Sequence, residues 1–444
     1  MIFLIILFGF VLRLISLNQS LWLDEATTAL VAKMPVPDIF SKFLPADFHP
    51  PLYYLIMKTW TTVFGYSEIS LRIPSIIFGL GTIYFAYLIG KKLFNKKTGL
   101  IASALLATSG LAVYYSQEAR MYALAAFLVS CSIYFLLEKK WIIFSVIVAL
   151  IGMTDYVSLF IIPVYFFIEQ KHWKKIILSL TPFTLSFLLW SPLFFKQILA
   201  GLSVKGTSWW NLLGTANFKN ISLIPIKFMF GRISFDNKIL YFVLVTVAIS
   251  LFGFLLYKSL KASKILWAWM VFPILAGFTV SFIIPTMTYF RYLFCLLPFY
   301  LLVAYGVEKT GKLKKIITVL LIIFNVFTSG YYLLNPKFQR EDWRGLVNLV
   351  ESKKTSNSVT IFSADLNTEA YLYYAPNAKI TGREGIGDGY SQIWLVGYLG
   401  SAFGTDDSAK SKILALGYKE LARDQFNGIG LVYLYENKQS LPLK

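Results

Sequence analysis

Long apolar runs recur along most of this sequence, and they constrain its fold more than any other feature. A helix that crosses a membrane needs roughly 20 apolar residues to span about 30 Å of hydrocarbon. Apolar residues make up 57% of the 444, which is more than a soluble domain of this length could bury. We therefore expect a polytopic α-helical membrane protein with about eleven transmembrane helices. The expected spans lie near residues 2–17, 72–90, 98–115, 120–137, 141–153, 156–168, 176–195, 239–257, 265–284, 291–307 and 316–334.

The lysines indicate how these spans are oriented. Basic side chains concentrate in the cytoplasmic connections of membrane proteins. The connections after the second, fourth, sixth, eighth and tenth expected spans together contain 16 lysines and three acidic residues. We therefore place these connections and the N-terminus in the cytoplasm, and the C-terminal segment outside. This distribution accounts for most of the net charge of +19 without a nucleic-acid partner.

One stretch near the N-terminus is apolar but is not expected to cross the membrane. Residues 51–64 are too short and contain Lys58, and counting them as a span would place all five lysine clusters outside. We therefore expect one long external loop over residues 18–71. Its amphipathic helices, near 36–44 and 51–64, would lie in the membrane interface.

The composition changes beyond residue 334. Segment 335–444 contains 13 basic and 12 acidic residues, the balanced charge of a water-exposed surface. Its pattern predicts helices near 341–353 and 406–417, and strands at VTIFSA, IWLVGY and GIGLVYLYE. The sequence thus predicts a transmembrane domain over residues 1–334 and a small external α/β domain over residues 335–444.

Ionisable residues gather at the external ends of the expected spans. Asp24 and Glu25 stand together in WLDEATTA, although adjacent acids also suit the dipole at a helix start. His49, in FHPPLYYL, precedes two prolines that lead into a helix; it could also be an ordinary polar loop residue. Placing an Arg near the bilayer centre costs roughly 2.5–3.5 kcal/mol of insertion free energy, so such residues tend to have functional partners. The alternative is that the side chain extends to the lipid headgroups. The remaining candidates, from SLRIPS, YYSQEARMYAL and TMTYFRYLF, are Arg72, Glu118, Arg120, Tyr122 and Arg291.

This layer of carboxylates and cations suits a phosphate headgroup at the membrane surface and an acceptor that must lose a proton. In a sugar joined to a polyprenyl phosphate, the phosphate is already a good leaving group, so a second carboxylate acting as general acid is not required. One carboxylate could take the proton of the acceptor, and Arg and His would stabilise the departing phosphate. In-line attack would invert the anomeric centre.

The motifs WLDEA, HPPLYYL, LRIPS and SQEARMYAL, in this order, resemble those of GT-C glycosyltransferases of the protein O-mannosyltransferase and aminoarabinose-transferase group. The resemblance covers roughly residues 1–340 and implies a GT-C-like bundle whose first external loop supplies the catalytic base. That base falls on Asp24, with Glu25 adjacent. In aminoarabinose transferases a Lys before the proline of the second motif is thought to contact the carrier phosphate, and His49 stands at that position here.

In the same family resemblance, Arg120 and Arg291 look like further contacts of the donor phosphate. From its place in the external layer, Arg72 is expected to be another such contact, with Glu118 and Tyr122 in support. The oligosaccharyltransferase branch uses a divalent metal. This sequence offers no acidic cluster beyond Asp24 and Glu25, so we expect neither a metal nor a cofactor.

The expected activity is the transfer of a sugar from a polyprenyl monophosphate, such as undecaprenyl phosphate, to an unknown glycan, lipid or protein in a prokaryotic cell membrane. One alternative is a transporter or flippase of lipid-linked sugars, which would normally carry inverted repeats and mid-bilayer ionisable groups. We detect no such repeat, and the ionisable groups lie at one face. A third possibility is a polymerase or ligase that uses diphosphate-linked oligosaccharides.

Overall fold

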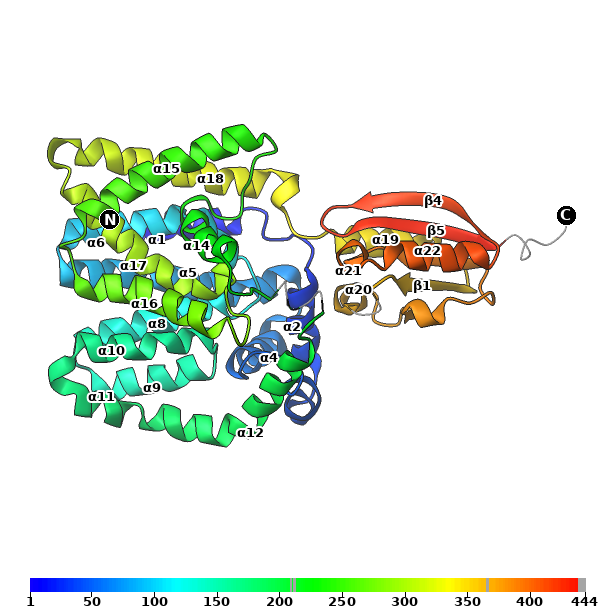
Figure 1. Ribbon diagram of the computed structural model, residues 1–444, viewed down its shortest axis with the longest axis horizontal. Coiled ribbons are helices and arrows are strands. Elements are labelled where there is room, and N and C mark those ends of the chain that lie inside the picture. Colours follow the sequence, from blue (N-terminus) through cyan, green and yellow to red (C-terminus); the bar gives the residue numbers. More distant parts are fainter. Residues whose placement is uncertain (208–209, 211–212, 365–366, 438–444) are drawn as a thin grey trace. The chain divides into compact units, whose positions relative to one another are not determined.

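The structure, a computed structural model, describes residues 1–207, 210, 213–364 and 367–437 (Figure 1). The chain forms two compact units. One contains residues 1–17 and 34–334 and is built from helices; the other contains residues 18–33 and the chain from residue 335, and holds a five-stranded sheet. We refer to them as the helical unit and the sheet unit.

Helices of the helical unit coincide with all of the expected spans. In the described part of the chain, five helices are long and apolar enough to cross a membrane, or six if α6 and α7, bent by 62°, form one span. Five shorter apolar helices account for the other expected spans. A helical membrane protein is thus confirmed, whereas the count of eleven stays a prediction. The helices are α1 (Ile2–Leu14), α5 (Glu68–Leu93), α6 (Lys96–Thr108) with α7 (Gly110–Ser116), α8 (Tyr122–Leu137), α9 (Trp141–Gly152), η2 (Val157–Ile161) with α10 (Ile162–Ile168), α11 (Trp173–Ser179), α12 (Thr181–Ser203), α15 (Lys238–Lys258), α16 (Lys264–Val280), η4 (Tyr289–Cys295) with α17 (Leu296–Glu308), and α18 (Lys314–Leu334).

Small residues let these helices bend and pack closely. Ser109 has an extended backbone between α6 and α7, and its hydroxyl accepts a hydrogen bond from the backbone N–H of Ala112, so it ends one helix and caps the next. A Cβ atom on Gly90 would lie 2.6 Å from the Cα atom of Gly99, so α5 and α6 meet through facing glycines. Such close approach through small residues is the usual way in which helices associate in membranes.

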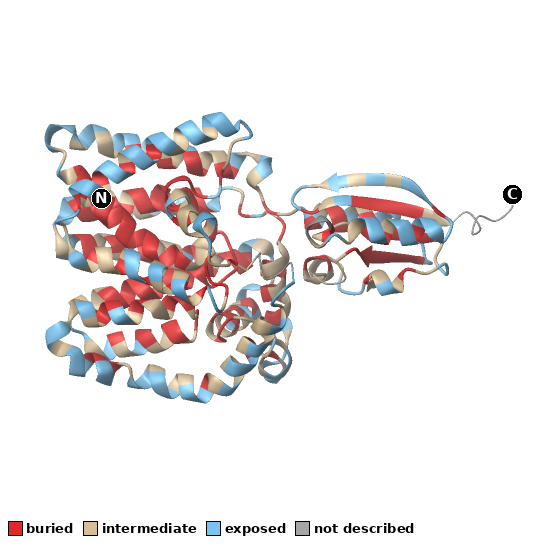
Figure 2. Ribbon diagram, in the orientation of Figure 1, coloured by how far each residue is buried: buried red, intermediate tan, exposed pale blue. Residues whose placement is uncertain are grey.

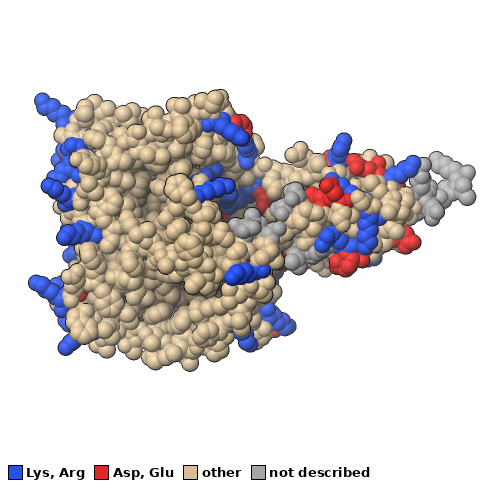
Figure 3. All heavy atoms as spheres, in the orientation of Figure 1, with Lys and Arg blue, Asp and Glu red and all other residues tan. Residues whose placement is uncertain are grey.

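The outer surface of the helical unit is apolar. Leu189 on α12 and Ile239 on α15 leave 86% and 78% of their surface uncovered, while the central helices are buried (Figure 2). Lys and Arg side chains lie along two opposite edges of this unit, with a broad surface almost without charge between them (Figure 3). Uncovered apolar side chains in a broad band are what lipid would cover.

Helices also form in the connections of the helical unit. The expected helices near 36–44 and 51–64 are present as α3 (Val36–Asp38) with the π-helix η1 (Ile39–Phe43), and as α4 (Leu52–Phe64). Lys58 donates to the carbonyl of Met34 at 2.6 Å, and Trp60 donates to that of Ser70 at 2.9 Å, which fixes α4 against its neighbours. A later connection contains α14 (Phe218–Phe230).

The sheet unit is a small α/β fold. Its strands are β1 (Ser358–Phe362), β2 (Ile380–Thr381), β3 (Gln392–Val396), β4 (Tyr418–Phe426) and β5 (Gly430–Asn437), in the order β2-β1-β3-β5-β4. Strands β2, β1 and β3 are parallel, whereas β5 is antiparallel to both β3 and β4. Val359 and Ile361 face Ala409 and Ile413, which lie on α22 (Asp406–Ala415). Phe362 points the other way and stacks on Trp343 of α19 (Trp343–Lys353).

The predicted elements of this unit are present, and others were not predicted. The helices expected near 341–353 and 406–417 are α19 and α22, and the three expected strands are β1, β3 and β5. The short strand β2, the short helix α20 (Glu369–Tyr374) and the strand β4 are additional. Strand β4 is an edge strand with mostly exposed polar residues, so its sequence, YKELARDQF, carries no apolar run that would mark a strand.

Residues 18–33 pack with the sheet unit although they come directly after α1. Within them α2 (Leu23–Lys33) lies against α20. The backbone N–H of Leu21 donates to the hydroxyl of Tyr374 at 2.8 Å, and the backbone N–H of Arg344 donates to the hydroxyl of Ser20 at 3.0 Å. The segment that carries the predicted catalytic acids is therefore built into the sheet unit.

Candidate functional site

A polar cluster forms around His49 in the helical unit. The Nδ1 atom of His49 lies 3.4 Å from a carboxylate oxygen of Asp47 and 3.4 Å from a guanidinium nitrogen of Arg120. The hydroxyl of Tyr54 donates to the other oxygen of Asp47 at 2.8 Å and accepts from Arg120 at 3.2 Å. Asp47, His49, Tyr54 and Arg120 thus form one closed network, which we call the His49 cluster.

Local folding explains why these four residues meet. The prolines of FHPP end the loop and start α4, so Tyr54 stands in the first turn of that helix and faces back over the loop. Arg120 lies in the turn between α7 and α8, and its backbone carbonyl is 3.5 Å from the hydroxyl of Ser75 on α5. Three separate parts of the chain therefore hold the cluster.

The cluster is buried and carries opposite charges. Burial alone would raise the pKa of Asp47, but His49, Arg120 and Tyr54 outweigh it and hold that pKa below its usual value. Asp47 therefore stays a carboxylate that orients the imidazole. Because Nδ1 of His49 is engaged by Asp47 and Arg120, Nε2 is the nitrogen that can contact a ligand.

A cavity of about 300 Å³ adjoins this cluster within the helical unit. His49, Arg291 and the buried Asp155 line it, and most of its remaining wall is apolar. Gln197 fixes one side, since its amide donates to the carbonyls of Leu44 and His49 at 2.8 and 3.1 Å. An apolar cavity with cations in its wall is suited to a hydrocarbon chain that ends in an anion. Its apolar wall includes Phe48, Phe160, Phe187, Phe194, Ile198 and Ile284.

Arg291 reaches this cavity from η4. One guanidinium nitrogen donates to the carbonyl of Pro285 at 3.0 Å, and its Nε atom is buried without a hydrogen-bond partner in the described part of the chain. The rings of Tyr122 and Phe290 lie 4.9 Å apart, so the start of α8 packs against η4. The structure thus brings two predicted cations, His49 and Arg291, to one cavity.

Arg72 and Glu118 have other surroundings. Arg72 is fully buried and donates to the carbonyl of Leu17 at 2.7 Å, just past the end of α1. Glu118 is buried close to Arg232, which lies over the ring of Tyr114 at 4.4 Å. Their predicted roles at the donor phosphate stay predictions.

The predicted catalytic acids lie in the first turn of α2, in the sheet unit. Glu25 is fully buried, whereas Asp24 is partly exposed. The backbone carbonyl of Asp24 accepts a hydrogen bond from the hydroxyl of Thr28 at 3.0 Å, one turn along the helix. Asp24 is therefore the member of the pair whose carboxylate can meet a substrate.

Several polar residues of the site were not among the predicted candidates. Asp47 stands only two residues before His49, and this acid–His spacing was a signal that could have been used. Lys227 and Arg232 are two further basic residues of the helical unit; burial and the charge of Arg232 lower the pKa of Lys227 to about 8. Tyr54 and Gln197 carry no sequence signal, since their roles arise from contacts distant in the chain.

Comparison with known proteins gives matches over part of the sequence and over the whole fold. Residues 48–195 match the family model of dolichyl-phosphate-mannose-protein mannosyltransferases. A putative mannosyltransferase of Bacillus subtilis, YkcB, is 29% identical over 141 residues, which are 29% of this chain and 18% of that protein. The chain thus spans about a fifth of the length of this curated relative.

Two solved structures share the fold. The crystal structure of ArnT from Cupriavidus metallidurans in the apo state matches with a TM-score of 0.57 at 12% identity, over 98% of this chain and 97% of that one. The apo oligosaccharyltransferase of Archaeoglobus fulgidus matches with a TM-score of 0.53 at 11% identity, over 100% of this chain and 75% of that one. The likeness extends over both units of the chain.

Proposed function

We propose that the chain is a GT-C glycosyltransferase that transfers a sugar from a polyprenyl monophosphate to an acceptor outside the cytoplasm, with inversion. The family match over residues 48–195 and the fold shared with ArnT support this proposal. The acceptor would be a glycan, a lipid or a protein. The observation that carries the proposal is the apolar cavity with His49 and Arg291 in its wall and Arg120 behind His49. A prenyl chain would occupy the cavity, and its phosphate would meet the cations.

The carrier is inferred from the family and from the chemistry of this site. The family model is that of enzymes whose donor is a dolichyl phosphate, and ArnT has been crystallised bound to undecaprenyl phosphate. Both carriers combine a long prenyl chain with one phosphate. Guanidinium groups bind phosphate through paired, charge-assisted hydrogen bonds, which suits Arg120 and Arg291 to this headgroup.

The reaction needs one base and a stabilised leaving group. A hydroxyl or amine of the acceptor attacks the anomeric carbon, and the bond from that carbon to the phosphate oxygen breaks. The proton of the acceptor passes to the carboxylate of Asp24, and polyprenyl phosphate leaves with the electron pair of the broken bond. His49, Arg120 and Arg291 would stabilise the negative charge that develops on the phosphate.

The proposed topology places this reaction on the external face. The N-terminus and the lysine-rich connections would be cytoplasmic, and residues 18–71 and the sheet unit extracytoplasmic, in a prokaryotic cell membrane. The helices that coincide with all eleven expected spans support it, because they leave the lysine-rich connections after every second span.

Binding and transfer with matched carriers test the proposal. The purified chain in nanodiscs should bind undecaprenyl monophosphate and should transfer sugar from undecaprenyl phosphate that carries glucose, mannose or aminoarabinose. Transfer only from diphosphate-linked oligosaccharides would instead identify a polymerase or ligase. Movement of the labelled lipid between leaflets of proteoliposomes, without transfer, would identify a flippase.

A further inference from the structure

The sheet unit winds in opposite directions from its two central parallel strands. After β1 the chain passes through α20 to β2 at one edge, and after β3 it passes through α22 to β4 at the other edge. The two helices cover opposite faces, because Ile413 of α22 packs with Ile361, whereas Tyr371 of α20 stands edge-on to Phe362. In open α/β sheets, ligands bind beyond the carboxyl ends of the strands at such a switch point. The carboxyl ends of β1 and β3 are therefore where this unit is expected to hold a ligand.

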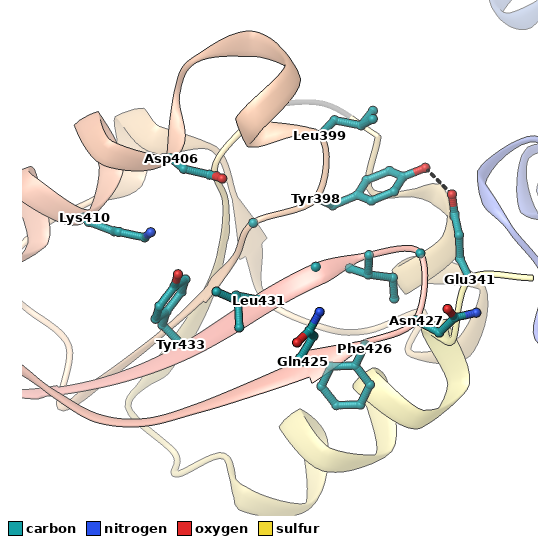
Figure 4. A pocket seen from close by; sticks show the side chains of 14 residues that line it. Glu341, Tyr398, Leu399, Asp406, Lys410, Gln425, Phe426, Asn427, Leu431 and Tyr433 are labelled. Carbon is teal, nitrogen blue, oxygen red and sulfur yellow. Dashed lines mark hydrogen bonds between the residues drawn. The ribbon is translucent and has the colours of Figure 1, made fainter. Parts of the chain in front are cut away.

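A groove of about 880 Å³ lies at this end of the sheet (Figure 4). Its wall is formed by the loop after β3, the start of α22 and the turn that joins β4 to β5. Asp406 and Lys410 of α22, Gln425 of β4 and Tyr433 of β5 point into it (Figure 4). Small-molecule sites commonly have volumes of about 300–1,000 Å³ and a few convergent polar groups. The groove meets both conditions.

A pair of buried oxygens stands beside Gly400, in the loop after β3. Oδ1 of Asp406 and Oγ of Ser363, the residue directly after β1, are buried and have no hydrogen-bond partner in the part of the chain that the structure describes. A Cβ atom on Gly400 would lie 1.7 Å from the first oxygen and 2.2 Å from the second, so both converge on this glycine. Buried polar atoms are rarely left without partners, because this costs stability. Two of them at a switch point indicate a ligand that supplies the missing hydrogen bonds.

The loop after β3 is held in place from both sides. The backbone N–H of Gly397 donates to the carbonyl of Leu431 at 3.0 Å, and the hydroxyl of Tyr398 donates to the carboxylate of Glu341 at 3.0 Å (Figure 4). Leu399 follows with a left-handed φ of +56°. A residue other than glycine keeps such a backbone only where its surroundings impose it, and such residues gather at ligand sites. The groove is therefore preorganised for binding.

The charges around the groove favour a neutral ligand. Asp406 and Glu341 place two carboxylates in its wall. The ammonium of Lys410 lies 4.5 Å over the ring of Tyr433 and 4.0 Å from the carboxylate of Asp407, so it is already engaged. An anion would meet the two carboxylates, and a lipid tail would leave the polar groups unpaired. Sugar hydroxyls both donate and accept hydrogen bonds, and the apolar face of a sugar ring can lie against an aromatic side chain.

We propose that this groove is a carbohydrate-binding site, which holds a neutral sugar of the acceptor. Hydroxyl groups of the sugar donate to the carboxylate of Asp406 and share a hydrogen bond with Ser363. Gln425 and Tyr433 contact the rest of the ring. The binding of a sugar follows from the sheet unit alone, and only the identification of that sugar as the acceptor rests on the proposed transferase function.

Binding to full-length protein in nanodiscs, without any donor, tests the site. The probes are fluorescently labelled trisaccharides of glucose, galactose, mannose and N-acetylglucosamine, and at least one of them should bind. Asp406→Ala should raise its Kd by about 10- to 150-fold, because a hydrogen bond to a charged group is lost, and Ser363→Ala should raise it by about 2- to 12-fold. Failure of every trisaccharide to bind, or displacement of the bound one by inorganic phosphate, would overturn the proposal.

The neighbouring acid provides the matched control. Asp407 lies in the same first turn of α22, and its side chain is fully exposed. Asp407→Ala removes the same charge from the same helix start and should leave the Kd unchanged. Asp406→Asn keeps the shape of the side chain, so it should fold like the wild type and still raise the Kd by about tenfold. Equal binding by Asp406→Asn and Asp407→Ala would refute the role of Asp406.

Transfer assays separate this site from the proposed activity. With the bound trisaccharide offered as acceptor, Asp406→Asn should raise the KM for the trisaccharide by about tenfold and leave the binding of undecaprenyl phosphate within twofold of the wild type. An unchanged KM, in a variant that has lost sugar binding, would refute the groove as the acceptor site. Sugar binding by a wild-type protein that transfers from no polyprenyl-phosphate donor would instead refute the transferase function and support the carbohydrate site.

Discussion

Replacing Arg120 by Lys should weaken the binding of undecaprenyl phosphate while the charge at this position is kept. In the His49 cluster the guanidinium of Arg120 contacts both Tyr54, at 3.2 Å, and His49, at 3.4 Å. In the proposed function the same guanidinium also contacts the donor phosphate. Lys offers a single compact ammonium, so at least one charge-assisted hydrogen bond is lost, and the planar contact with Tyr54 and His49 is lost as well.

The magnitude follows from the number of bonds lost. A hydrogen bond to a charged group contributes about 1.5–3 kcal/mol. Since about 1.4 kcal/mol corresponds to a tenfold change in Kd, the Kd for undecaprenyl phosphate should rise by about 10- to 150-fold. The fold should survive, because a positive charge remains beside the carboxylate of Asp47.

Binding of fluorescently labelled undecaprenyl phosphate to protein in nanodiscs measures this effect. Arg423→Lys is the matched control, because Arg423 is an exposed residue of β4 whose side chain is 68% accessible. The control should bind like the wild type. If Arg120→Lys bound the lipid within twofold of the wild type at the same thermal stability, the assignment of Arg120 to the phosphate would be wrong.

Three further predictions concern pH, packing and metals. Burial and the charge of nearby Asp24 raise the pKa of Glu341 from 4.5 to about 7, while Trp343, Tyr398 and the Leu23 N–H oppose this rise. Glu341 therefore contributes its full share to the free energy of unfolding below pH 4.5, and this share is lost as the pH rises through about 7. The share is at most about 3 kcal/mol. In Glu341→Gln, thermal melts should lose this part of the pH dependence. A Cβ atom on Gly306 would lie 2.1 Å from the carbonyl oxygen of Leu255. In a detergent melt, Gly306→Ala should therefore lower the stability by about 1–3 kcal/mol. Gly253→Ala is the control and should not lower it, because a Cβ atom there meets open space on α15. Finally, EDTA should leave sugar transfer unchanged, and a loss of activity restored by a divalent cation would contradict metal independence.

Much of the fold could be predicted because membrane crossing leaves a strong signal in the sequence. The long apolar runs predicted α5, α12, α15 and α18. The motifs HPPLYYL, LRIPS and SQEARMYAL lie within residues 48–195, which match the family model, whereas WLDEA lies outside that range. The break at Ser109 was not predicted, because a single capping serine within an apolar run looks like any small residue in a span. Strand β4 was not predicted, because an edge strand needs no apolar run.

The site was predictable only where charge stands out against an apolar sequence. His49 and Arg120 could each be named as a candidate contact of the phosphate, and the structure places them 3.4 Å apart. Tyr54 was missed because its partner Arg120 lies in another part of the chain. Asp47 was missed because its spacing of two residues from His49 was not used as a signal. Glu341 lay in a segment whose composition looked like an ordinary water-exposed surface.

The central claim is that Asp24 removes the proton of the acceptor while the cations of the helical unit hold the donor phosphate. Single-turnover transfer by Asp24→Asn, with the donor already bound, tests it most directly. The control is Asp38→Asn, at a partly exposed acid of the same expected loop that pairs with Lys42. We predict that Asp24→Asn lowers the transfer rate by about 10²- to 10⁴-fold and leaves the binding of undecaprenyl phosphate within twofold of the wild type. A transfer rate equal to that of the control would contradict this account.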